Sequence, residues 1–321
     1  KEVVDEIYDQ ICKVLDQGNI EYVKWDMNRN FSDIYSPYLP AAKQGETAHR
    51  YVLGLYQIME ELTTRFPKIL FEGCSAGGNR FDLGILCYFP QIWASDNTDA
   101  LCRTGIQNSY SYGYPLSVFT AHVSSCPNHQ TLRITPLETR FQVASFGILG
   151  YECNLKDLSG SDLNAIREQI AFYKKWRDVF QFGSFYRGAE NEASDSETLS
   201  WTCVSPDGRR AVGLFFRRLT VPNQSHDWYR PVGLLPDVKY HFYGRNIKYN
   251  LKDFGDLVNT VSPIHIKQGS ALQEILSRFV NMDGEKEDLT AYGDTLMRAG
   301  IALKPAFAGT GYNSDTRLFQ D

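Results

Sequence analysis

Long hydrophobic runs are missing from this chain of 321 residues. The sequence has no stretch of about 18 consecutive apolar residues, the length that a helix needs to span a bilayer. The N-terminal residues KEVVDEIYDQ also lack the apolar core of a signal peptide. The sequence therefore predicts a soluble protein without a membrane partner.

An excess of positive charge is missing as well. The chain has 33 Lys and Arg residues against 38 Asp and Glu residues, a net charge of −5. This balance leaves no basic footprint for nucleic acid, and the pairs Arg209–Arg210 and Arg217–Arg218 lie in strand-like surroundings. We therefore expect no nucleic-acid partner. The hydrophobic fraction of 43% is typical of a globular protein.

Metal-ligand and disulfide patterns are absent too. The seven cysteines are odd in number and contain no CxxC pair, which favours a reducing cytoplasm over a disulfide framework. The six histidines show no HExxH or other ligand spacing. We therefore expect a cytoplasmic protein with no metal and no cofactor.

Helical and strand-like segments alternate through the first half of the chain. Apolar spacing predicts helices over residues 3–15, 46–65, 80–89, 99–111, 136–146 and 161–180. Strands are predicted over residues 20–26, 68–74, 91–96, 117–124 and 149–155. This alternation indicates an α/β fold with parallel strands, either a barrel or a doubly wound sheet.

Polar residues at the strand ends favour the barrel. Asp26, residues 74–78 and Asp96 each follow a predicted strand, and a (β/α)8 TIM barrel assembles its active site from strand C-termini. The stretch GCSAGGNR does not supply the GxGxxG turn of a dinucleotide-binding sheet. A complete barrel has eight strands, and only five are predicted here. We therefore expect residues 1–180 to correspond to strands 4 to 8 of a longer protein.

The pattern changes after residue 181. Short β-type runs such as LSWTCVS, RRAVGLFFRRL, YHFYG and RNIKYNL follow one another, with a turn at SPDGRR. Two helical patches, GSALQEILSRFV and AYGDTLMRAG, come later. Residues 181–321 are therefore predicted to form a small antiparallel β-sandwich domain.

Two carboxylates at strand ends suit glycoside hydrolysis. Asp26 and Asp96 lie two β/α units apart and would face the same mouth of a barrel. In this chemistry one carboxylate attacks the anomeric carbon and the other donates a proton to the leaving oxygen. Lys24 lies on the same side of its strand as Asp26 and would keep it ionised and bind sugar hydroxyls, whereas Trp25 faces the helices. The alternative is a purely structural Lys24–Asp26 ion pair.

For other candidate site residues near Asp26 and Asp96, a structural role explains the sequence about as well as a functional one. The CSAGGNR segment at residues 74–80 either brings backbone close to a ligand or forms a tight turn, and Cys74 suits a buried position. Asp99 competes with Asp96 for the acid role but leads into a helix, which makes it the better N-cap. His122 and His129 follow a strand end and serve equally well as loop supports.

Three long motifs resemble one enzyme family. YVKWDMNR, EGCSAGGNRFDLGILCYFPQIWASDNTDA and HVSSCPNHQTLRITPLETRFQVASFGILGYE are similar to the catalytic barrel of bacterial family 36 glycoside hydrolases, the retaining α-galactosidases. The terminal LMRAGIALKPAFAGTGYNSDTRLFQD resembles the end of the same enzymes. The resemblance implies that Asp26 is the nucleophile and Asp96 the acid/base. It also implies a galactose subsite lined by Lys24, Trp25, Met27, Asn28, Cys74, Ser75, Ala76 and Gly77. Ala76 and Asn79 stand where many relatives carry glycine.

The same resemblance implies the activity. It points to an exo-α-galactosidase that hydrolyses oligosaccharides such as melibiose and raffinose by double displacement, as a homo-oligomer that is often a tetramer. The family also has an N-terminal β-sandwich and three further barrel units, which contribute two aspartates, a tryptophan and an arginine to sugar binding. None of these can be placed in this sequence. The alternatives are a galactosyl transferase of the raffinose-synthase type and a non-catalytic sugar-binding or assembly fragment.

Overall fold

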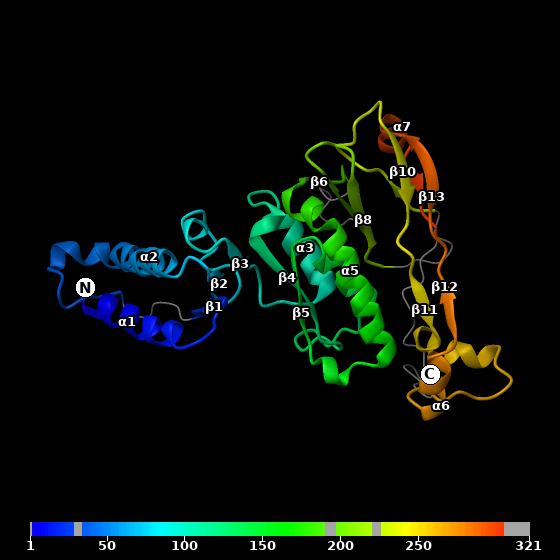
Figure 1. The fold of residues 1–321 in the computed structure, drawn as a ribbon, viewed down its shortest axis with the longest axis horizontal. Coiled ribbons are helices and arrows are strands. Elements are labelled where there is room, and N and C mark those ends of the chain that lie inside the picture. Colours follow the sequence, from blue (N-terminus) through cyan, green and yellow to red (C-terminus); the bar gives the residue numbers. More distant parts are fainter. Residues whose placement is uncertain (1, 29–33, 190–196, 220–225, 305–321) are drawn as a thin grey trace, which may run out of the picture.

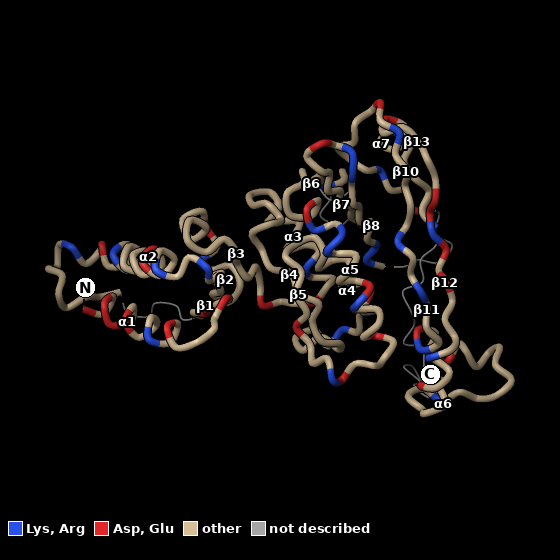
Figure 2. The backbone as a smooth tube through the Cα atoms, viewed as in Figure 1, with Lys and Arg blue, Asp and Glu red and all other residues tan. Residues whose placement is uncertain are grey.

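The computed structural model describes residues 2–28, 34–189, 197–219 and 226–304. Figure 1 shows an α/β part that contains β1 to β5, followed by antiparallel strands on the other side of α5. Acidic and basic residues are interspersed along the described chain (Figure 2). None of the helices in these ranges is long and apolar enough to cross a membrane. The last residues of the terminal motif, 305–321, lie outside the described residues.

The first five strands form one parallel sheet in sequence order. The strands are β1 (Tyr22–Asp26), β2 (Leu70–Cys74), β3 (Gln91–Trp93), β4 (Phe119–Ser124) and β5 (Ile148–Glu152). Each pairs in parallel with the next. A doubly wound sheet reverses its strand order at a switch point, whereas a barrel keeps sequence order. The observed order therefore confirms the predicted α/β class and excludes the doubly wound alternative for these strands.

Five α-helices accompany the parallel strands: α2, α3 and α4 connect strands, α1 precedes β1 and α5 follows β5. They are α1 (Glu2–Asp16), α2 (Thr47–Arg65), α3 (Ala100–Tyr110), α4 (Leu137–Ala144) and α5 (Gly160–Phe182), with short 3-10 segments at Ala41–Glu46, Leu116–Val118 and Leu155–Asp157. The sequence explains the start of α5, because Ser159 and Asp162 form a reciprocal capping box. Ile166, Tyr173 and Phe180, seven residues apart, lie on one buried face of this helix.

One predicted helix is wrong. Residues 80–89 contain only a 3-10 turn at Ile85–Cys87. The Asp82 carboxylate accepts a hydrogen bond from the backbone N–H of Ile85 at 2.9 Å, and Pro90 prevents the turn from continuing as a helix.

The second part consists of small antiparallel sheets, as the sequence predicts. One sheet contains β6 (Ser184–Arg187), β7 (Thr198–Val204) and β8 (Ala211–Arg217). Three two-stranded pairs follow: β10 (Lys239–Tyr243) with β13 (Asp288–Tyr292), β11 (Lys248–Asn250) with β12 (Asn281–Asp283), and β14 (Ile301–Ala302) with β9 (Trp228–Tyr229). The predicted helical patches contain α6 (Ala271–Ser277) and α7 (Gly293–Arg298), and a kinked 3-10 segment spans Leu251–Thr260.

A continuous apolar core joins the parallel sheet to the β6–β8 sheet. Trp201 of β7 is fully buried, and its ring centroid lies 5.3 Å from that of Phe146 and 6.0 Å from that of Phe185. Its indole N–H also donates to Asn108 Oδ1 of α3 at 3.1 Å. The same indole therefore stabilises both parts of the chain.

Arg245 provides a second contact between the parts. This residue follows β10, and its guanidinium pairs with Glu138 of α4. The guanidinium carbon also lies 4.9 Å from the ring centroid of Phe141 and 5.4 Å from that of Phe172. Burial lowers the pKa of Arg245 to about 10, so the side chain stays charged at neutral pH and keeps its ion pair.

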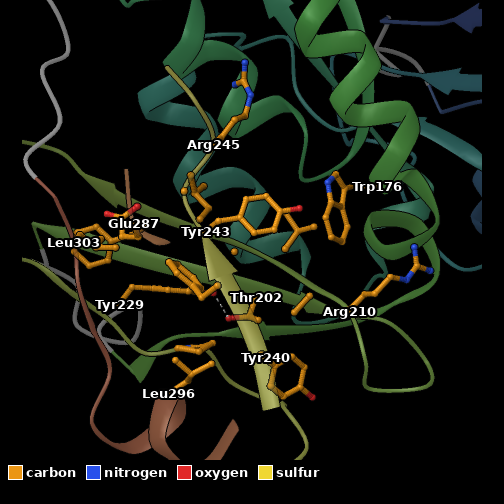
Figure 3. Close-up of a pocket in the computed structure, with 18 of the residues that line it drawn as sticks. Trp176, Thr202, Arg210, Tyr229, Tyr240, Tyr243, Arg245, Glu287, Leu296 and Leu303 are labelled. Atoms are coloured by element: carbon orange, nitrogen blue, oxygen red, sulfur yellow. Dashed lines mark hydrogen bonds between the residues drawn. The ribbon is translucent and has the colours of Figure 1, made fainter. Parts of the chain in front are cut away.

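A cavity of about 560 Å³ is lined by residues of α5, β7, β8 and β10 (Figure 3). Trp176 of α5 and Tyr243 of β10 line it, and the hydroxyls of Thr202 and Tyr229 hydrogen-bond at its wall over 2.7 Å. Its lining includes none of the predicted sugar-binding residues. The cavity is therefore separate from the strand ends at which the sequence places the chemistry.

We predict that Trp201→Ala destabilises the protein by about 3–5 kcal/mol, because it leaves a large cavity between the two parts. Trp228→Ala is the matched control, since Trp228 is 48% exposed and surface changes usually cost less than about 0.5 kcal/mol. Urea unfolding followed by circular dichroism measures both. Equal stability of the two variants would show that Trp201 does not connect the parts.

Candidate active site

The ends of β1 and β2 lie next to each other. Asp26 is the register partner of Cys74, and the backbone N–H of Met27 donates to the carbonyl oxygen of Cys74 at 3.1 Å. Cys74 is 4% exposed, as predicted for a buried position. Burial, and then a hydrogen bond to Asp26, raise the pKa of the Cys74 thiol to about 11. The thiol therefore stays protonated and acts as a donor beside the exposed Asp26 carboxylate.

Asn28 and Ser75 join the two strand ends further. Asn28 Nδ2 donates to Asp26 Oδ2 at 3.2 Å, and Asn28 Oδ1 accepts from the backbone N–H of Ala76 at 2.6 Å. Ser75 Oγ donates to the carbonyl oxygen of Met27 at 2.5 Å. These contacts bring together the two predicted groups, residues 26–28 and residues 74–77, and fix the orientation of Asp26.

Residues 74–77, here called the 74–77 loop, have a backbone conformation that accounts for the small residues in this segment. Ala76 has φ of 46° and Gly77 has φ of 83°, both in the left-handed region that side chains other than glycine disfavour. A Cβ added to Gly77 would lie 2.6 Å from Ser95 Cα. The 74–77 loop therefore contacts the residue before Asp96, so both predicted carboxylates adjoin the same loop.

Lys24 has a different partner from the one predicted. Its Nζ lies 3.7 Å from Glu72 Oε1 and 4.2 Å from the centroid of the Trp93 ring. Lys24 thus pairs with Glu72, its register partner in β2, rather than with Asp26. The physical reason is burial: Glu72 is 1% exposed and needs a cation, whereas Asp26 is exposed to water.

Glu72 was not predicted as a member of the site. Burial raises its pKa, although hydrogen bonds from Gln91 and Thr120 act in the opposite direction. Gln91 Nε2 lies 2.9 Å from Glu72 Oε2, and the Tyr22 hydroxyl also donates to this oxygen. The signal in the sequence was a single charge inside the otherwise apolar strand ILFEGC.

Trp25 and Met27 lie apart from the polar groups. The Trp25 ring packs against the core with its centroid 5.9 Å from that of Phe89, a residue of the connection between β2 and β3. The Met27 sulfur accepts a hydrogen bond from the Tyr51 hydroxyl of α2 at 3.0 Å. The structure therefore does not place either side chain with Lys24, Asn28 and the 74–77 loop.

Asp96 lies beyond the strand that was predicted to end with it. Strand β3 ends at Trp93, and Asp96 is an exposed residue of the following loop. The Trp93 indole N–H donates to Asp96 Oδ1 at 2.8 Å. The strand is shorter than predicted because its pairing with β4 ends at Trp93, opposite Thr120. In the loop that follows, Ser95 Oγ accepts a hydrogen bond from the N–H of Asn97 at 3.1 Å.

Asp99 has the predicted structural role. Its carboxylate caps α3 by accepting from the backbone N–H groups of Leu101 and Cys102 at 2.8 and 3.1 Å. Arg133 Nη1 lies 2.7 Å away. Burial opposes ionisation of Asp99, but hydrogen bonds, above all from Thr131, and the Arg133 charge outweigh it and lower its pKa. A saturated, buried carboxylate is a poor proton donor, so Asp96 remains the acid/base candidate.

His122 supports the site from β4. Its ring centroid lies 4.7 Å from that of Trp93, and its Nδ1 lies 3.3 Å from Glu152 Oε2. Burial, together with the charges of Lys24 and Arg103, lowers the pKa of His122 against the opposing effect of Glu152, so the ring is neutral at pH 7. His129 is exposed to solvent. Among the residues that the structure describes, no cluster of His, Cys, Asp and Glu could hold a metal ion, and all seven cysteines are free.

Two family models match the sequence. The model described as Melibiase matches residues 1–183, and the model described as Glycosyl hydrolase family 36 C-terminal domain matches residues 198–319. Alpha-galactosidase 1 of Pediococcus pentosaceus is 48% identical over 238 residues, which cover 74% of this chain and 32% of the relative. Alpha-galactosidase Mel36A of Lactobacillus acidophilus is 48% identical over 240 residues, 75% of this chain and 32% of the relative. The chain thus spans about a third of the length of these relatives.

Solved structures agree with this relationship. The GH36 alpha-galactosidase AgaA of Geobacillus stearothermophilus, in a complex with raffinose, has a TM-score of 0.78 and 37% identity, with 96% of this chain and 37% of that chain covered. The alpha-galactosidase of Lactobacillus brevis has a TM-score of 0.79 and 36% identity, with 98% and 36% covered. A complex of AgaA with stachyose has a TM-score of 0.78 at 38% identity, with 96% and 37% covered. Because one model matches more than half of the sequence and the second follows it along the chain, this chain belongs to the melibiases of glycoside hydrolase family 36.

Proposed function

We propose that the full-length protein is a retaining exo-α-galactosidase that removes terminal α-galactosyl units from oligosaccharides such as melibiose and raffinose. The observation that carries the proposal is the 74–77 loop, which hydrogen-bonds to Asn28 beside Asp26 and contacts the backbone before Asp96. Asp26 at the end of β1 and Asp96 in the loop after β3, both exposed, therefore lie on either side of this loop. Relatives in complexes with raffinose and stachyose support the substrate class.

The chemistry is a double displacement. An Asp26 oxygen attacks C1 of the galactosyl unit while Asp96 donates its proton to the leaving glycosidic oxygen, so that a covalent galactosyl-enzyme forms. Asp96 then removes a proton from water, and the resulting hydroxide attacks C1 and releases Asp26. The two inversions at C1 give galactose with the configuration of the substrate.

The surrounding residues have separate roles in this proposal. Asn28 and Cys74 orient Asp26 through hydrogen bonds, and the 74–77 loop brings Ser75, Ala76 and Gly77 to the galactose subsite. Lys24, held by Glu72 at 3.7 Å, offers its remaining donors to sugar hydroxyls. Trp25 and Met27 support the subsite by packing behind it. The proposed reaction needs no metal or cofactor.

We also propose the architecture of the whole protein. Residues 1–180 supply strands 4 to 8 of a (β/α)8 barrel, and residues 181–321 form a β-sandwich domain. Strands β1 and β5 each have a single partner within the described residues, and the matched structures are longer than this chain. We further propose that the protein is cytoplasmic, which is consistent with the free cysteines. We also propose that it is a homo-oligomer, a tetramer in the family pattern.

The nucleophile is tested first. We expect Asp26→Ala to lower the turnover of an aryl α-galactoside by about 10³-fold or more in the full-length protein, because no covalent intermediate can form. Added azide should restore turnover and yield β-galactosyl azide by a single inversion. Asp237→Ala, at an exposed position, is the control. Normal turnover by Asp26→Ala would contradict the assignment, and galactose transfer to added raffinose by the unmodified protein would identify a transferase.

The acid/base is tested through the leaving group. Asp96→Ala should lose far more activity on raffinose than on an aryl α-galactoside with a good leaving group, because only the poor leaving group needs a proton. Azide should now give α-galactosyl azide, since it attacks the covalent intermediate in place of water. Equal losses on both substrates would remove Asp96 from this role.

The 74–77 loop gives a third prediction. Gly77→Ala should lower kcat/KM by about 10- to 100-fold, because its methyl group would displace the Ser95 backbone and with it Asp96. Gly105→Ala in α3 is the matched control, since a Cβ there meets nothing within 4 Å and alanine favours a helix. Kinetics with raffinose measure both variants. Unchanged kcat/KM in Gly77→Ala would mean that the loop does not position Asp96.

A further inference from the structure

We infer that Trp93 and Arg103 are positioning residues that hold Asp96 in place, and we call this pair the clamp. Trp93 binds the carboxylate of Asp96, and Arg103 binds the backbone of the residues before and after Asp96. This inference rests on the proposed role of Asp96 as acid/base. It adds two residues from the end of β3 and from α3 that do not need to contact the sugar.

Trp93 fixes one oxygen of the carboxylate. Its indole N–H donates to Asp96 Oδ1 at 2.8 Å, within the normal range of an N–H···O hydrogen bond. Because Oδ1 accepts this bond, Oδ2 is the oxygen free to carry the proton to and from the reacting groups. The indole therefore determines which oxygen of Asp96 faces the substrate.

The indole itself is held in place. Trp93 is 3% exposed, and its ring is contacted by Lys24 Nζ at 4.2 Å, by the Arg103 guanidinium carbon at 4.6 Å and by the His122 ring at 4.7 Å, measured between centroids for the histidine. Cations over an indole are attracted to its electron-rich face. The ring has little freedom to rotate, so its N–H points at a fixed place.

Arg103 holds the backbone around Asp96. It is 2% exposed; its Nη2 donates to the carbonyl oxygen of Ser95 at 2.5 Å, and its Nε donates to that of Asn97 at 2.7 Å. Nη1 reaches the carbonyl oxygen of Thr120 in β4 at 3.3 Å. Burial lowers the pKa of Arg103 to about 10, so it stays protonated at neutral pH. The residues before and after Asp96 are thus bound to the sheet through one guanidinium.

The clamp restricts the position of Asp96, which itself lies in an exposed loop. A general acid must reach the leaving oxygen within hydrogen-bond distance, and a displacement of about 1 Å can cost about 100-fold in rate. The fork of a buried guanidinium restricts the loop in a way that a flexible ammonium would not. A purely structural role predicts a different result, namely a loss of stability with equal effects on all substrates.

The main test is Trp93→Phe in the full-length protein, because phenylalanine keeps an aromatic ring but removes the N–H. We expect kcat for raffinose to fall by about 10- to 100-fold, with KM and the kcat for an activated aryl α-galactoside changed less than about threefold. Ile92→Val in the same strand, where Ile92 is 2% exposed, is the packing control and should affect both substrates equally. Equal losses in Trp93→Phe would overturn the inference.

Arg103→Lys provides an independent arm. It keeps the charge but cannot bind the carbonyl oxygens of Ser95 and Asn97 together, so the same selective loss on raffinose is expected. In an Asp96→Ala background, neither substitution should lower the rate on raffinose further. If Asp96→Ala alone is not selective for the leaving group, the proposed function fails. If Asp96→Ala is selective but Trp93→Phe and Arg103→Lys are not, only the clamp is refuted.

Discussion

Parallel pairing in sequence order is the constraint on which the site depends. It places the ends of β1, β2 and β3 at one edge of the sheet, so residues far apart in the sequence meet there. The 74–77 loop uses this proximity: its amide binds Asn28, and the open space at Gly77 admits the backbone of Ser95. A side chain at Gly77 would separate the two carboxylates without altering either of them.

Buried charge is the second organising feature. Glu72 and Arg103 are nearly inaccessible to water, and each is compensated by polar partners, Glu72 by Lys24, Gln91 and Tyr22. Arg103 is compensated by backbone carbonyl oxygens. Burying such groups costs desolvation free energy. Their polar contacts offset part of this cost and at the same time restrict Lys24 and the loop that contains Asp96. The exposed carboxylates Asp26 and Asp96 are thus supported by buried charges behind them.

The sequence predicts the parallel strands and the two carboxylates because alternating apolar segments and polar strand ends are local patterns. It misses what depends on contacts between strands. Spacing along the strand pairs Lys24 with Asp26, two residues away, but register places Lys24 opposite Glu72. The apolar pattern of QIWASD predicts a strand that ends at Asp96, yet β3 ends at Trp93. The role of Arg103 could not be seen, since its partners are backbone oxygens.

The covalent intermediate tests the account most directly. The full-length protein can be treated with a fluorinated galactosyl fluoride that reacts rapidly in the first step and slowly in the second, followed by peptide mass spectrometry. The account predicts one galactosyl-type adduct on Asp26, within the peptide that contains YVKWDMNR. An adduct on another carboxylate, or inverted galactose released without any adduct, would contradict it.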